Sequence, residues 1–148
     1  MRFALDTNIL IYFLEGSDPD VQSILEDAIF APVARGEATA VVATLSIAEL
    51  LVPLFRSGAV DDARQVRRDL EDALGIECVP LDGAVAELAA QIRGAARLRL
   101  PDAIVVASAI AAEADALVTN DQSLAAVALP IPIVRPAELR AQDPRADR

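Results

Sequence analysis

The fold is decided by residues 100–121, LPDAIVVASAIAAEADALVTND. From Ala103 to Ala112 this stretch is apolar on all sides of a helix, so the helix must be buried. A short apolar run, Ala116–Thr119, follows almost at once and is typical of a buried strand. A buried helix that leads into a buried strand predicts a crossover unit of a parallel sheet.

The rest of the chain repeats this alternation of short apolar runs and helix-length segments. The other predicted strands are Arg2–Leu5, Thr39–Ala43, Glu77–Leu81 and Ile131–Val134. The predicted helices cover Ile9–Leu14, a segment from Asp18 that Pro32 and Gly36 close, Thr44–Phe55 with a break near Pro53 and Gly58, Asp61–Leu74, and Val85–Ile92. Strands without polar alternation are buried on both faces. The sequence therefore predicts an α/β fold, a three-layer α/β/α sandwich around a five-stranded, mainly parallel sheet.

Length and composition set the organisation of the chain. Its 148 residues suit one domain, which we expect over residues 1–140, with a polar tail at 141–148. With 54% hydrophobic and only 3% aromatic residues, the core must consist of aliphatic side chains. The longest nearly uncharged apolar stretch is about half of the ~20 residues that a bilayer crossing needs. We therefore expect a cytoplasmic protein with no membrane partner.

The absence of two residue types excludes several chemistries. All 13 basic residues are arginine, and the sequence contains neither lysine nor histidine. This excludes Schiff bases, the lysine of a P-loop, Ser-His or Cys-His relays, histidine-based RNA cleavage and Cys/His zinc sites. The net charge of −10 argues against a nucleic-acid binder that depends on a basic face. Carboxylates are the remaining candidates for chemistry.

Four acidic residues fall at one predicted edge of the sheet. Asp6 ends the first strand and Asp121 follows the fourth. Glu49 lies in the helix after the second strand. Asp102 begins the buried helix, which runs antiparallel to the strand it precedes, so its amino end lies at the same edge. Carboxyl ends of parallel strands meet at one edge, where ligands bind.

Each acid also has a purely structural interpretation. Asp6 and Asp121 suit helix N-caps, Asp102 suits the first turn of a helix, and Ser46 with Glu49 fits a capping box. Capping does not require four acids at one edge, and Glu49 and Asp102 have apolar neighbours in sequence, where an unpaired charge is costly. Clustered carboxylates repel one another unless cations lie between them, and such hard oxygen ligands prefer Mg²⁺ or Mn²⁺. The sequence therefore predicts a divalent-metal site.

Four short motifs, in this order and spacing, carry a resemblance to a known family. They are Leu5-Asp6-Thr7-Asn8, Ser46-Ile47-Ala48-Glu49-Leu50, Leu100-Pro101-Asp102-Ala103-Ile104 and Thr119-Asn120-Asp121. In these motifs the chain resembles the PIN-domain ribonucleases, and within them the VapC-like toxins of toxin–antitoxin pairs. The resemblance implies a PIN-like fold in which the four acids bind metal and catalyse, with Thr119 as a polar support in the catalytic site.

The implied activity is that of a Mg²⁺- or Mn²⁺-dependent endoribonuclease that leaves 5′-phosphate and 3′-hydroxyl ends. An RNA substrate needs positive groups beside the acids, and Arg97 and Arg99, just before Asp102, are the expected contacts; the alternative is that they form a solvated helix face. The implied partner is a small antitoxin protein. We also expect a homodimer, because Ile9–Leu14, Ala28–Val33 and Leu50–Phe55 are more apolar than the obvious core faces require; the alternative is that these segments pack inside.

Other functions remain open at this stage. The alternatives are a PIN-type RNA-processing nuclease without an antitoxin and a non-catalytic PIN-like binding scaffold. Haloacid-dehalogenase-like phosphatases also place an aspartate after the first strand, but they need a second one where Asn8 stands and a later lysine. A flap-endonuclease-type DNA nuclease needs additional DNA-binding elements that 148 residues do not accommodate.

Overall fold

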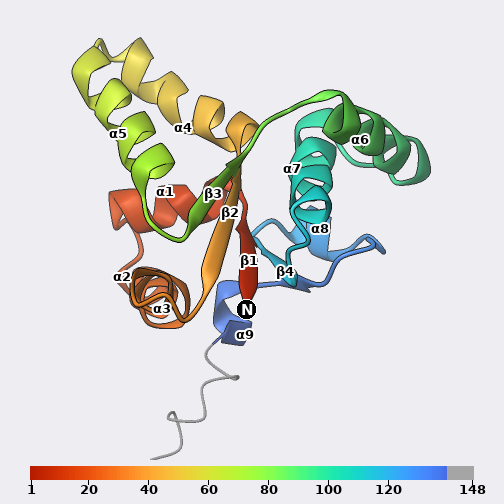
Figure 1. Ribbon diagram of the computed structural model, residues 1–148, viewed down its shortest axis with the longest axis horizontal. Helices are drawn as coiled ribbons and strands as arrows, with labels where there is room; N and C mark the ends of the chain where they lie inside the picture. Colours follow the sequence, from red (N-terminus) through yellow and green to blue (C-terminus); the bar gives the residue numbers. More distant parts are fainter. Residues whose placement is uncertain (140–148) are drawn as a thin grey trace, which may run out of the picture.

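The computed structural model describes residues 1–139 and contains one five-stranded sheet (Figure 1). Its strands are β1 (Arg2–Leu5), β2 (Thr39–Ala43), β3 (Ile76–Val79), β4 (Ala116–Val118) and β5 (Ile133–Val134). The strand order is β3-β2-β1-β4-β5 and every pairing is parallel. This confirms the predicted sheet. The last strand is shorter than predicted, since Pro130 and Pro132 have no N–H to donate to a ladder.

Helices cover both faces of the sheet. They are α1 (Thr7–Glu15), α2 (Pro19–Leu25), the π-helix η1 (Glu26–Phe30), α3 (Ala31–Ala34), α4 (Thr44–Arg56), α5 (Val60–Asp72), α6 (Gly83–Ala95), α7 (Leu100–Ala111), α8 (Gln122–Ala125) and α9 (Pro136–Leu139). Helices α6 and α7 pack together on one face, and α1 to α5 lie on the other (Figure 1). The three-layer α/β/α sandwich is therefore confirmed.

The strands explain how one sheet supports two hydrophobic cores. Along β1, Ala4 points into the core beneath α6 and α7, whereas Phe3 and Leu5 point into the core beneath α1 to α5. Helix α7 is buried at every position from 103 to 109, as its apolar sequence predicts. Because α7 runs antiparallel to the strands, its first turn lies at the carboxyl edge of the sheet.

Two prolines lie inside helical segments, and each segment ends shortly after its proline, close to the predicted end. Helix α4 continues through Pro53 to Arg56 without a break. Pro53 lies in the last turn of the helix, so only one backbone hydrogen bond is lost there. Before Pro32 the chain widens into η1 and then continues as α3. This wider turn, in which the Ala31 N–H bonds to the Glu26 carbonyl, accommodates the proline ring.

Two expectations concern the ends and the environment of the chain. The predicted domain boundary at residue 140 and the polar tail at 141–148 lie outside the described residues. None of the helices within residues 1–139 has the length and apolar character that crossing a lipid bilayer requires.

Candidate functional site

Asp6 lies directly after β1 and is the most buried of the four predicted acids. It is 8% exposed. Its Oδ1 accepts the Thr7 N–H at 2.7 Å, so Asp6 is the N-cap of α1. The capping role considered from the sequence is therefore real. It occupies only one of the two carboxylate oxygens.

The second oxygen of Asp6 is held by two side chains. Asp6 Oδ2 accepts hydrogen bonds from Thr119 Oγ1 at 2.7 Å and from Asn8 Nδ2 at 2.9 Å. Thr119, at the end of β4, is fully buried, and its Oγ1 also accepts the Asp121 N–H at 3.0 Å and an Asn8 Nδ2 hydrogen at 3.2 Å. Thr119 thus fixes the carboxylate of Asp6 and the backbone of Asp121 relative to each other.

Asn8 and Asn120 belong to the same network, although the sequence analysis assigned them no role in the site. Asn8 Oδ1 accepts the Asn120 N–H at 3.1 Å, and Asn120 Nδ2 donates to Tyr12 Oη at 3.2 Å. These bonds tie α1 to the loop after β4. Asn8 is a polar residue in an otherwise apolar helix segment, two positions after Asp6, and that position was the available signal.

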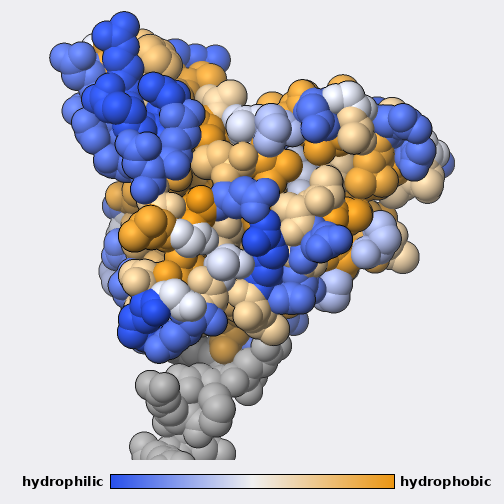
Figure 2. Space-filling view, in the orientation of Figure 1, coloured by the Kyte–Doolittle hydropathy of each residue, from blue (hydrophilic) through white to orange (hydrophobic). Residues whose placement is uncertain are grey.

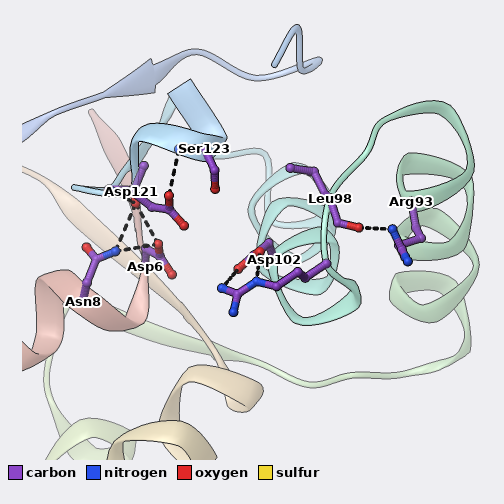
Figure 3. A network of polar contacts seen from close by, with 9 residues as sticks. Asp6, Asn8, Arg93, Leu98, Asp102, Asp121 and Ser123 are labelled. Atoms are coloured by element: carbon purple, nitrogen blue, oxygen red, sulfur yellow. Dashed lines mark hydrogen bonds and ion pairs between the residues drawn. The ribbon is translucent and has the colours of Figure 1, made fainter. Parts of the chain in front are cut away.

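Asp121 and Asp102 complete the group that surrounds Asp6. Asp121 caps α8 through a hydrogen bond from the Ser123 N–H to its Oδ1 at 2.8 Å. Asp102 lies in the first turn of α7, as its alternative interpretation predicts. Figure 3 shows Asp6 and Asp121 side by side, with Asp102 facing them from α7. The structure therefore places Asp102 and Asp121 within electrostatic reach of Asp6.

Burial and mutual repulsion make this group electrostatically unusual. Burial raises the pKa of Asp6 above its ordinary value, while hydrogen bonds from Thr119 and Thr7 lower it in part. The negative charges of Asp102 and Asp121 raise the same pKa further. A carboxylate in this position is stabilised by any positive charge that approaches it.

Arg99 supplies positive charge at this edge. Its Nε donates to Asp102 Oδ2 at 2.9 Å and its Nη2 donates to Asp102 Oδ1 at 3.2 Å. This pair raises the pKa of the Arg99 guanidinium, and the charges of Asp121 and Glu49 add to the effect. Glu49 thus lies within electrostatic reach of the same site.

The environment predicted for Glu49 is wrong. Its apolar sequence neighbours suggested a buried charge, but Glu49 is exposed on α4: Leu50 is buried and Leu51 is half-buried, whereas Ala48 is exposed like Glu49. The capping-box interpretation is also wrong: Ala43 precedes α4 and the helix has no side-chain cap. Ser46 is instead fully buried, one turn before Glu49.

The donor set fits a hard divalent cation in its chemistry. Carboxylate oxygens prevail, and two buried hydroxyl groups, Thr7 Oγ1 and Ser46 Oγ, have no hydrogen-bond partner within the described residues. Mg²⁺ usually keeps several water ligands, which such hydroxyls can contact. In residues 1–139, no three acidic, histidine or cysteine side chains already form a metal-binding group. Asp102 faces Arg99, so a cation at this position competes with the guanidinium.

The two predicted substrate contacts differ in their surroundings. Arg99 is held by Asp102, whereas Arg97 is exposed in the loop before α7, and no side-chain partner is seen for it in residues 1–139. A third arginine, Arg93, donates to the Leu98 carbonyl and fastens this loop to α6 (Figure 3). The loop therefore presents one guanidinium group, that of Arg99, beside the acids, and a second exposed arginine two positions earlier.

Comparisons with known proteins agree with the fold. The family model of the PIN domain matches residues 3–129. VapBC2 from Rickettsia felis, bound to a DNA fragment from its promoter, is similar at a TM-score of 0.68 and 19% identity over 91% of this chain and 98% of that chain. A toxin–antitoxin complex from Klebsiella pneumoniae has a TM-score of 0.67 and 23% sequence identity, over 90% of this chain and 96% of that chain. The sarcin–ricin loop cleaving toxin VapC20 from Mycobacterium tuberculosis has a TM-score of 0.62 and 12% sequence identity, over 85% of this chain and 96% of that chain. No curated protein matches the chain.

Proposed function

The chain belongs to the PIN domain family, and from this premise we propose that it is a divalent-metal-dependent endoribonuclease and the toxin of a toxin–antitoxin pair. The observation that carries the proposal is the meeting of Asp6, Asp102 and Asp121 at the carboxyl edge of a parallel sheet. Glu49, in electrostatic reach of Arg99, is the fourth member of the proposed catalytic set.

The residues present suit phosphodiester hydrolysis. A bound Mg²⁺ or Mn²⁺ would activate a water molecule for in-line attack and stabilise the leaving 3′ oxygen, giving 5′-phosphate and 3′-hydroxyl ends. Asp6, Glu49, Asp102 and Asp121 would hold the cation. Thr119 keeps Asp6 oriented through the 2.7 Å hydrogen bond. A carboxylate held in this way loses little freedom when it binds a cation.

The positive groups of the α6–α7 loop are the proposed contacts for RNA. Arg97 is exposed and Arg99 has a side chain that is 78% exposed. A guanidinium can make two parallel hydrogen bonds to a phosphate. Positive charge beside the acids offsets part of the repulsion that a chain of net charge −10 exerts on RNA.

Chelation tests the proposed enzyme directly. We expect single-stranded RNA to be cleaved with Mg²⁺ or Mn²⁺, and the activity to disappear in EDTA and return with excess Mn²⁺. Because water is the proposed nucleophile, products should carry 5′-phosphate and 3′-hydroxyl ends, which end-specific phosphatase and ligase treatment identifies. Cleavage that persists in EDTA, or 2′,3′-cyclic phosphate ends, would exclude this mechanism. No cleavage with any cation would favour a binding scaffold.

The proposed partners are an antitoxin and a second copy of the chain. The apolar segments that suggested partners are partly buried and partly exposed. Ile9, Ile29 and Leu50 lie in the core. Val52 and Phe55, on α4, are 43% and 50% exposed. Figure 2 shows hydrophobic side chains gathered around the notch between the α4–α5 arm and the α6–α7 pair. Exposed apolar area of this kind is typical of protein interfaces.

Two measurements test the partners. We expect light scattering to give a mass of two chains that falls on dilution, and we expect Phe55→Asp to shift the protein toward one chain, because it places a charge on exposed apolar surface. Co-expression with the product of the adjacent small gene should suppress cleavage. A concentration-independent mass of one chain would refute the dimer. A lack of co-purification and suppression would leave an RNA-processing nuclease.

A further inference from the structure

The Arg99–Asp102 pair occupies both oxygens of one proposed metal ligand. Arg99 Nε meets Oδ2 at 2.9 Å and Nη2 meets Oδ1 at 3.2 Å, so the fork of the guanidinium covers the carboxylate. The Asp102 side chain is only 13% exposed, and Arg99, at 78%, covers it from the solvent side. A cation that reaches Asp102 from solvent therefore meets Arg99 first.

The pair is built so that it can separate. Arg99 is the residue before the first helical position of α7, so its side chain can swing away while Asp102 stays fixed in the helix. An ion pair with one partner this exposed contributes little to stability, since water screens it. Asp102 and Asp121 act on Asp6, and Asp121 and Glu49 act on Arg99, so several negative charges meet here and favour a divalent cation over a single positive charge.

We propose that Arg99 is an exchangeable counter-ion of the site: it neutralises Asp102 in the metal-free protein and leaves the carboxylate when a divalent cation binds. This rests on the proposed metal-dependent nuclease. The guanidinium and the cation compete, because two positive charges on one carboxylate repel each other. The released guanidinium remains beside the acids, in reach of a phosphate. Arg99 thereby limits the affinity of the free enzyme for its metal.

The control for this idea lies in the same loop. Arg97 is two residues earlier, carries the same charge and is exposed, but no hydrogen bond or ion pair of its side chain is seen among residues 1–139. Arg97→Ala therefore removes a nearby positive charge without freeing Asp102. Arg99→Ala removes the same charge and also uncovers the carboxylate. Comparing the two variants separates direct competition from the general electrostatic field.

The experiment is a calorimetric titration of the full chain with Mn²⁺ at low ionic strength, without RNA. We expect Arg99→Ala to bind Mn²⁺ about two- to fivefold more tightly than the parent, the range that an exposed ion pair supplies. Arg97→Ala should change the Kd by a clearly smaller factor than Arg99→Ala does, and Asp102→Asn should weaken binding. Thermal unfolding gives a second readout: Arg99→Ala should melt below the parent in EDTA and gain more from saturating Mn²⁺.

The outcomes separate this inference from the proposed function. Equal Mn²⁺ affinity of Arg99→Ala and the parent, with weaker binding by Asp102→Asn, would overturn the counter-ion role and leave the metal site intact. Equal tightening by Arg97→Ala and Arg99→Ala would also overturn it, because the effect would then be general. A parent that binds no Mn²⁺, or an Asp102→Asn variant that binds it normally, would refute the metal site itself together with this inference.

Discussion

Asp102→Asn should lower RNA cleavage by more than about a hundredfold while the protein stays folded. Loss of one group that stabilises transition-state charge typically costs about 10²–10³ in rate, and here the lost group is also a proposed metal ligand. Asparagine has nearly the same size as aspartate, and removing this charge relieves its repulsion of Asp6. The melting temperature of the metal-free protein should therefore change little. Initial cleavage rates with Mn²⁺ and thermal unfolding in EDTA measure both effects.

Asp61→Asn provides a matched control. Asp61, like Asp102, lies in the first turn of a helix, but this turn is at the outer end of the α4–α5 arm (Figure 1). Both substitutions remove a favourable interaction with a helix dipole, worth about 0.3–1 kcal/mol. Only Asp102→Asn should abolish cleavage. If instead Asp102→Asn lowers the melting temperature strongly and keeps activity, the aspartate serves the helix and not the chemistry.

Thr119→Val should destabilise the metal-free protein by about 2–3 kcal/mol, because hydrogen bonds to a charged group are stronger than those between neutral groups. A chain of about 150 residues loses about 2–4 °C in melting temperature per kcal/mol, so the melting temperature should fall by roughly 5–10 °C. Valine fits the same space but removes the hydroxyl that donates to Asp6 and accepts the Asp121 N–H. Asp6 Oδ2 then keeps only the hydrogen bond from Asn8, and the partly buried Asp121 N–H loses its partner. Urea unfolding at neutral pH measures the effect.

The stability deficit of Thr119→Val, that is, its loss of unfolding free energy relative to the parent, depends on pH with a definite sign. The Thr119 hydrogen bond lowers the pKa of Asp6, so the valine variant raises that pKa above its value in the parent. The deficit is then fully present above the pKa of Asp6 in the variant, where the carboxyl is ionised in both proteins. It shrinks as the pH falls through the pKa of Asp6 in the parent, because the protonated acid depends less on the bond. The part of the deficit that comes from the lost partner of the Asp121 N–H remains at low pH.

Thr7→Val is the control for this substitution. Thr7 is also buried and also borders Asp6, but its Oγ1 has no partner within the described part of the chain, and its N–H bond to Asp6 survives the change. We expect its stability to equal or slightly exceed that of the parent at every pH. A similar loss in both variants would mean that the network around Thr119 contributes no more than ordinary packing.

Local sequence patterns were sufficient for the fold. Apolar runs without alternation predict strands that are buried on both faces, and the all-apolar helix from Ala103 could only be internal. The parallel topology then places Asp6, Asp102 and Asp121 at one edge whatever the details of packing. The course of α4 at Pro53 was not predictable in this way, because a proline near the end of a helix can either end it or be accommodated in its last turn.

The sequence by itself determined which elements form, in what order, and which acids reach the edge of the sheet, since hydrophobic period and strand direction are properties of short segments. Only the tertiary structure decided what each side chain touches. Thr119 and Asp6 are 113 positions apart, and their hydrogen bond exists because β1 and β4 are neighbours in the sheet. The exposure of Glu49 depends on what packs against α4, and the pairing of Arg99 with Asp102 depends on a rotamer. The first two of these features arise from packing between distant segments and the third from a side-chain conformation, and hydrophobic periodicity encodes neither.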